Sequence, residues 1–222
     1  PYDTKISLRN VNQIPDTDII RYVRQMLLAK ESAAYGNNTL FQDKLLWIAR
    51  MYQSQGIEYV EISDTTLVKK QESIRMLQEV HEVMPAIQRE TGVHIRFLAA
   101  IRRIPLTIIK DALTPATYLK DNLSVLRAVC LDPYVVGSDF VGEEINDISE
   151  MKPVIEELVK IAKDDPGFTI RIHAGENNGL KDNVSTAVKL VKDALQKGQS
   201  FPHVRIGHGL YTASLRSQKG KQ

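Results

Sequence analysis

Five short, strand-like segments recur at nearly equal spacing, and this rhythm limits the possible fold more than any other feature of the chain. Their starts lie 35 to 40 residues apart. The segments are GIEYVEI (56–62), VHIRFLAAI (93–101), PYVVGSDF (133–140), FTIRIHA (168–174) and HVRIGHG (203–209). Each is rich in β-branched residues and bounded by turn or helix signals, which is typical of buried parallel strands. The spacing therefore predicts repeated βα units.

Helical patterns occupy the intervals between these segments. Apolar residues recur at helical spacing over roughly 41–54, 70–90 and 115–130. After the third strand, Asp147 followed by Glu150 resembles a helix start, and after the fourth strand Asp182 and Asn183 are candidate caps. The first 35 residues look helical and loop-like, without a convincing strand.

The alternation of strands and helices allows two architectures, an open doubly wound sheet or a (β/α)8 barrel. Neither a G-x-G-x-x-G turn nor a P-loop occurs, so the barrel is preferred. A closed barrel needs eight strands and about 250 residues. We therefore expect one incomplete TIM-barrel domain over 1–222, lacking the first and last strands. Its parts would be a lead-in over 1–40, βα units over 41–212 and a tail over 213–222.

Composition excludes several kinds of partner. The formal charge of +2 is too small to indicate a nucleic acid or an anionic membrane as partner, and no apolar run is long enough to span a bilayer. The single cysteine, Cys130, cannot form an internal disulfide. These features predict a cytoplasmic protein.

Candidate catalytic residues follow the last three strands, where parallel sheets present their chemistry. Asp139 and Gly142 follow the third strand, His173 and Glu176 the fourth, and His208 ends the fifth. One βα unit separates the two histidines, so we expect their imidazoles on neighbouring strands. Imidazole ligands and a nearby carboxylic acid suit metal-assisted hydrolysis, in which zinc lowers the pKa of bound water.

Each of these residues also has a purely structural interpretation. A histidine at a strand end is more often a hydrogen-bonded structural group than a ligand, and His-x-x-Glu alone is a weak pattern. The other charged residues near strand ends have plain expected roles: structural histidines (His81, His94, His203), a solvated loop pair (Glu143, Glu144) and salt-bridging arginines (Arg102, Arg103). Arg171 shares a strand face with His173, and we expect Glu61 as its partner carboxylate.

Three stretches in a fixed order carry a family resemblance. VVGSDFVGEE (135–144), HAGE (173–176) and RIGHG (205–209) resemble the adenosine deaminase family of the amidohydrolase superfamily. The resemblance covers roughly residues 40–212. It implies a (β/α)8 barrel, one zinc ion, and hydrolytic replacement of the 6-amino group of a purine nucleoside with release of ammonia.

The resemblance also implies individual roles. His173 would ligate the metal, Glu176 would protonate the purine ring nitrogen, and His208 would orient or deprotonate the attacking water. Gly142 would offer its backbone amide to the purine, and Asp139 would support that loop.

The chain departs from the family at two places. The family's first strand carries a His-x-His pair, whereas no two of the five histidines here lie two positions apart, and the family's later Asp-Asp strand has no counterpart. We therefore expect an incomplete and inactive piece of a purine nucleoside deaminase. Two alternatives stay open: an amidohydrolase for a different amine or amide, and a non-catalytic partial barrel that self-associates through exposed sheet edges.

Overall fold

The computed structural model describes residues 13–25, 37–103 and 115–212. It is an α/β structure with one sheet of five parallel strands in the order β1-β2-β3-β4-β5, which is also their order along the chain. The strands are β1 (Tyr59–Asp64), β2 (His94–Arg102), β3 (Val135–Val141), β4 (Thr169–Ala174) and β5 (His203–His208). Each of the five predicted strands is thus confirmed, with ends shifted by up to three residues.

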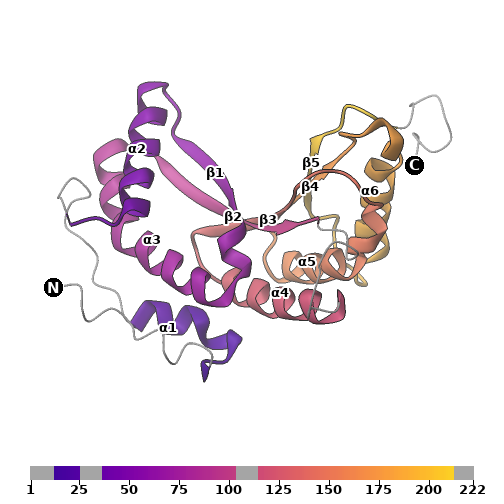
Figure 1. The fold of residues 1–222 in the computed structure, drawn as a ribbon, viewed down its shortest axis with the longest axis horizontal. Helices are drawn as coiled ribbons and strands as arrows, with labels where there is room; N and C mark the ends of the chain where they lie inside the picture. The colour runs from indigo at the N-terminus through magenta and orange to yellow at the C-terminus, as the bar shows by residue number, and fades with distance from the viewer. Residues whose placement is uncertain (1–12, 26–36, 104–114, 213–222) are drawn as a thin grey trace. The chain divides into compact units, whose positions relative to one another are not determined.

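Helices separate the strands, as the sequence predicts (Figure 1). The α-helices are α1 (Ile19–Gln25), α2 (Leu40–Ser54), α3 (Lys70–Thr91), α4 (Pro115–Val129), α5 (Lys152–Asp164) and α6 (Asn183–Asp193). Short 3-10 helices are η3 (Asp16–Asp18), η4 (Thr65–Val68), η5 (Ile148–Met151) and η6 (Asn178–Leu180). The expected tail and most of the expected lead-in lie outside the described residues.

The chain divides into two compact units. The first comprises residues Pro1–Leu98 and Ser124–Val135, and the second comprises Ala99–Leu123 and Val136–Gln222. In the first unit α2 and α3 pack against each other (Figure 1). A capping box starts α2: Thr39 accepts a hydrogen bond from the Gln42 amide, and the Gln42 side chain accepts one from the Thr39 amide.

A hydrogen bond to a buried carboxylate anchors α3 within this first unit. The Nε2 atom of His81 lies 2.6 Å from Oδ2 of Asp132, whose side chain is fully buried. The other carboxylate oxygen of Asp132 accepts a hydrogen bond from the Tyr134 amide. The structural role predicted for His81 is confirmed.

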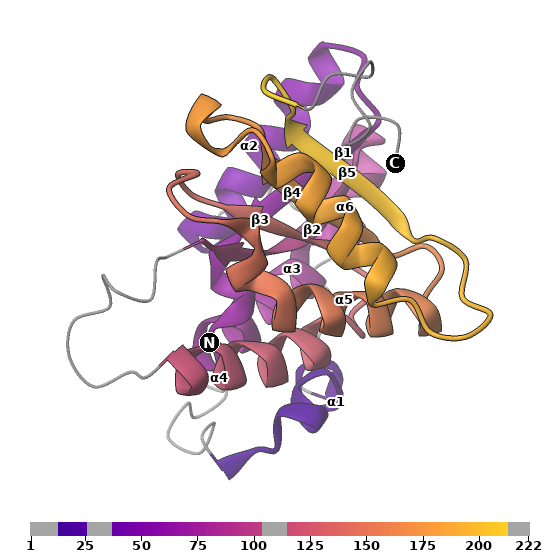
Figure 2. The ribbon, with the colours of Figure 1, turned by 90° about the vertical axis from the view of Figure 1, so that its right-hand side faces the viewer.

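The second unit positions the candidate site. Strands β3, β4 and β5 pair in parallel, and helices α5 and α6 pack on β4 (Figure 2). The side of α5 that faces inward carries an apolar stripe, with Val154, Ile155, Leu158 and Ala162 buried. The predicted helix start at Asp147 is confirmed as the N-cap of η5. There the Asp147 carboxylate accepts a hydrogen bond from the Ser149 amide.

Among the helices of the described residues, none is long and apolar enough to cross a membrane. Cys130 is buried and forms no disulfide. The expectation of a single domain over 1–222 stays a prediction.

Candidate functional site

The two candidate imidazoles lie side by side at the carboxyl ends of β4 and β5. The parallel register pairs His173 with Gly207 and Ala174 with His208. The ring centroids of His173 and His208 are 5.2 Å apart and the ring planes are inclined by 55°. Their expected placement on neighbouring strands is therefore confirmed.

The ring of His173 is held through one of its two nitrogen atoms. Nδ1 lies 2.7 Å from the carbonyl oxygen of Phe140 and 2.9 Å from Oδ1 of Asp139. The geometry favours a hydrogen bond from Nδ1 to the Phe140 carbonyl oxygen. The Asp139 carboxylate acts on the imidazole through its charge. Because the carbonyl only accepts, Nδ1 carries the proton and Nε2 is left for another partner.

Charge around His173 favours its protonated form. The contact with Asp139 raises the pKa of the His173 imidazole, and this effect outweighs the opposing effects of burial and of the Arg171 guanidinium. The protonated ring carries a second proton on Nε2, and a metal ion bound at Nε2 would have to displace it.

Asp139 lies between His173 and Arg171. Its side chain is buried, and Oδ2 lies 3.6 Å from Nη1 of Arg171. Asp139 is thus the observed partner of Arg171. The expected pairing of Arg171 with Glu61 joins residues of different units and stays a prediction.

The third expected group, Glu176, lies near His208. Its Oε2 atom is 3.7 Å from Nε2 of His208, and about half of each side chain is covered. The backbone of His208 has a φ of 65°, which is uncommon for a residue with a side chain and costs roughly 1–3 kcal/mol. Strain of this kind is concentrated at functional sites.

Gly142 lies in the bend that follows β3. It is exposed and has a φ of 102°, a conformation that favours glycine. Its expected contact with a purine stays a prediction.

The prediction of a solvated pair at Glu143 and Glu144 is wrong for Glu144. Glu143 is exposed, but Glu144 is only 3% exposed. Its carboxylate accepts hydrogen bonds from the amides of Gly175, Glu176 and Asn177 at 2.9, 2.6 and 2.7 Å. Burial acts to raise the pKa of Glu144, but these amides and the Asn183 side chain together hold it below its usual range. Glu144 is therefore ionised at neutral pH.

Arg103 accompanies Glu144 in the interior. It is 2% exposed and donates hydrogen bonds to the carbonyl oxygens of His173 (2.8 Å) and Asn146 (2.7 Å). Its Nη1 atom lies 3.6 Å from Oε1 of Glu144, which confirms the expected salt bridge for Arg103. Burial lowers the pKa of the guanidinium and the Glu144 carboxylate opposes that effect.

The surroundings of the His173 imidazole suit one ligand position of a zinc site. A histidine whose second ring nitrogen is fixed by a carbonyl or carboxylate is the usual arrangement of a metal ligand. Structural and catalytic zinc sites need at least three protein ligands. No group of three or more His, Cys, Asp or Glu that could hold a metal occurs within 13–25, 37–103 and 115–212. Nε2 of His173 could serve as one ligand of a metal ion, but the described residues supply no complete set of ligands.

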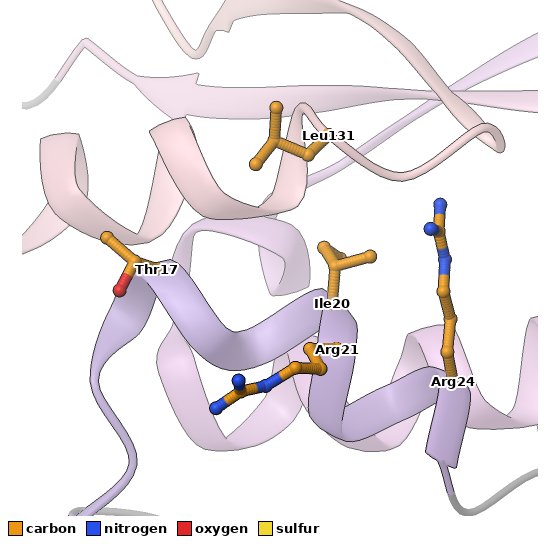
Figure 3. A pocket seen from close by; sticks show the side chains of 5 residues that line it. All are labelled: Thr17, Ile20, Arg21, Arg24 and Leu131. Atoms are coloured by element: carbon orange, nitrogen blue, oxygen red, sulfur yellow. The ribbon is translucent and has the colours of Figure 1, made fainter.

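Two surface pockets lie apart from this chemistry. One, of about 410 Å³, belongs to the first unit and is lined by Thr17, Ile20, Arg21, Arg24 and Leu131. In Figure 3, Ile20 and Leu131 face each other across it, and no lining residue carries a carboxylate, imidazole or thiol. The other, of about 400 Å³, includes His203, at the start of β5 and thus at the end of the strand opposite His208.

The chain was also compared with known proteins. No protein-family model matches it, and a search of curated proteins finds no match.

Proposed function

We propose that this site belongs to a zinc-dependent purine nucleoside deaminase that converts adenosine or a related adenine nucleoside into its inosine-type product and ammonia. One observation carries the proposal: two imidazoles and a carboxyl group meet at the carboxyl ends of β4 and β5. The resemblance of HAGE and RIGHG to the adenosine deaminase family agrees with this arrangement.

The roles follow from the groups available. Water adds to C6 of the purine while Glu176, as the acid, gives a proton to the ring nitrogen N1. His208 holds the water, takes its proton and passes that proton to the 6-amino group. The C6–N bond then breaks with release of ammonia, while the C6 hydroxyl loses its proton to Glu176 and becomes the carbonyl of the product. The distance of 3.7 Å between His208 and Glu176 suits two groups that handle protons on one substrate. Gly142 would direct its amide to the purine, beside the strand that bears Asp139.

Zinc, when bound, supplies a water of lowered pKa. In this chain Nε2 of His173 is the position that would hold it, with Asp139 and the Phe140 carbonyl fixing the ring. The His-x-His pair that the resemblance implies as further ligands does not occur in the sequence, so we propose that this 222-residue chain alone turns over little or no adenosine.

Two finer assignments complete the proposal. The parallel sheet of successive βα units would be part of a TIM barrel, whose chemistry lies at the carboxyl ends of its strands. The buried Cys130, which forms no disulfide, suits a reducing compartment such as the cytoplasm.

The test combines zinc content with an absorbance assay for adenosine loss. Both are measured on this chain and on a version extended along its coding sequence. We expect zinc and turnover in the extended form, and loss of turnover in Glu176→Gln. The matched control is Glu143→Gln, because Glu143 is a nearby exposed carboxylate.

Other outcomes decide between the alternatives. Full activity of the Glu176→Gln variant would refute the assigned acid. Zinc binding without adenosine loss would favour an amidohydrolase for another amine or amide. A protein that binds no zinc and self-associates would favour the non-catalytic partial barrel.

A further inference from the structure

A buried carboxylate holds the loop that carries Glu176. The side chain of Glu144 accepts hydrogen bonds from three successive backbone amides, those of Gly175, Glu176 and Asn177. Gly175 has a φ of 76°, and this left-handed turn allows consecutive amides to point at one anion. Glu144 thus occupies an anion-binding nest formed by its own chain.

Further contacts fix Glu144 itself. Its Oε1 atom accepts a hydrogen bond of 2.9 Å from the side chain of Asn183, at the start of α6. Its backbone carbonyl accepts one of 3.2 Å from the Asn177 side chain. The buried Arg103 guanidinium supplies the countercharge. Groups from three parts of the second unit, namely the residue after β2, the loop after β4 and the start of α6, therefore converge on this carboxylate.

The same contacts reach the two candidate site residues at the carboxyl end of β4, His173 and Glu176. Arg103 also donates a hydrogen bond to the carbonyl oxygen of His173. The amide of Glu176 makes the shortest of the three bonds to Glu144, at 2.6 Å. The backbone on either side of Ala174 is therefore fixed by one ion pair, although neither Arg103 nor Glu144 belongs to the HAGE motif.

The network around Glu144 is better suited to fixing geometry than to adding stability. A buried ion pair stabilises little in comparison with an apolar replacement, because both charges lose their hydration. Its hydrogen bonds do set geometry, and catalysis is sensitive to displacements of about 1 Å. Glu176 itself is exposed, and its carboxylate lies 3.7 Å from Nε2 of His208, so its place depends mainly on its backbone.

We infer that Glu144 is a positioning residue, whose carboxylate fixes the backbone at Gly175–Asn177 and thereby places Glu176 for proton transfer. The kinetic part of this inference rests on the proposed deaminase function. The conformational part does not, because it concerns only the hydrogen bonds of the loop.

The conformational part is tested by hydrogen–deuterium exchange at the amides of residues 175–177. The variants are Glu144→Gln, which removes the charge, and Glu144→Asp, which keeps the charge beside Arg103 but is too short to reach all three amides. Glu143→Gln is the control. We expect exchange at 175–177 to rise about tenfold or more in both Glu144 variants, with exchange in α3 unchanged. Exchange equal to that of the control in the folded Asp variant would overturn the inference.

The kinetic part is tested by a double-mutant cycle on the extended, zinc-loaded protein. With Glu176 present, Glu144→Gln should lower kcat about 10- to 100-fold while KM changes little. In the Glu176→Gln background the same change should have almost no further effect, because the group that Glu144 positions is already removed. An equal loss in both backgrounds would indicate a general structural role and overturn the inference.

The two proposals fail in different ways. If the extended protein does not consume adenosine, the proposed function is refuted while the exchange measurement still decides the role of Glu144. If turnover is present and exchange at 175–177 does not respond to Glu144, the deaminase stands and the positioning role is refuted.

Discussion

A Cβ atom at Gly207 would lie 2.6 Å from Cδ2 and 2.9 Å from Nε2 of His173. The two residues are register partners on β4 and β5, so the imidazole lies directly over the bare backbone of the neighbouring strand. A residue with any side chain at 207 would occupy the place of the ring.

Gly207→Ala should therefore displace His173. The new methyl group would force the ring away from the Phe140 carbonyl, and overpacking of this kind costs roughly 1–3 kcal/mol of unfolding free energy. Urea denaturation measures the loss, and the NMR signals of His173 should shift with it. In the control Gly167→Ala, the added Cβ atom would meet only the Asp165 side chain, at 3.3 Å. Equal effects of the two substitutions would contradict the packing relationship.

Gly175 and Gly92 allow a second prediction with a matched pair. Their φ angles are nearly equal, at 76° and 74°. An added Cβ atom at Gly175 would lie 2.6 Å from the carbonyl oxygen of Tyr211, whereas at Gly92 it would meet nothing within 4 Å.

Gly92→Ala should lower the free energy of unfolding by only about 1 kcal/mol, the cost of the left-handed backbone. Gly175→Ala should lower it by roughly 2–3 kcal/mol more, because backbone atoms must also move. Chemical denaturation of both variants gives the difference. Similar losses in the two would show that the contact with Tyr211 relaxes without cost.

Much of the fold follows from local sequence signals. The strand segments, the apolar stripe of α5 and the cap at Asp147 depend on periodicity and on residues a few positions apart, so the sequence alone predicts them. Barrel closure depends on pairing between distant segments, which periodicity cannot reveal.

The candidate site, like the fold, follows only in part from the sequence. The proximity of His173 and His208 follows from parallel βα geometry once both are placed at strand ends. Glu144 and its neighbour Glu143 are identical in type, and only the fold turns one inward and the other to solvent. The available signal was Gly175, whose left-handed turn exposes successive amides that need an acceptor.

The salt-bridge partner of Arg171 shows a further limit of predictions made from the alternation of side chains along a strand. Alternation predicts which strand face carries the guanidinium, but Asp139, on the adjacent strand β3, is the carboxylate that it meets. Register between strands decides the partner, and register is a property of the folded sheet.

The lowered pKa of Glu144 predicts a pH-dependent contribution to stability. Its ordinary value is 4.5, and the fold shifts it downward. A carboxylate with a depressed pKa in the folded state stabilises the protein fully above the unfolded value and loses this effect as pH falls through the folded value. At neutral pH, Glu144→Gln should therefore lower the unfolding free energy by roughly 3 kcal/mol, because it leaves Arg103 unpaired in the interior. Below pH 4.5 the difference from the wild type should shrink, since protonated Glu144 and Gln are alike in charge.

Urea unfolding of both proteins across this range measures the difference, with Glu143→Gln expected to stay within about 0.5 kcal/mol of the wild type. A difference that is independent of pH would show that Glu144 acts through packing and not through its charge.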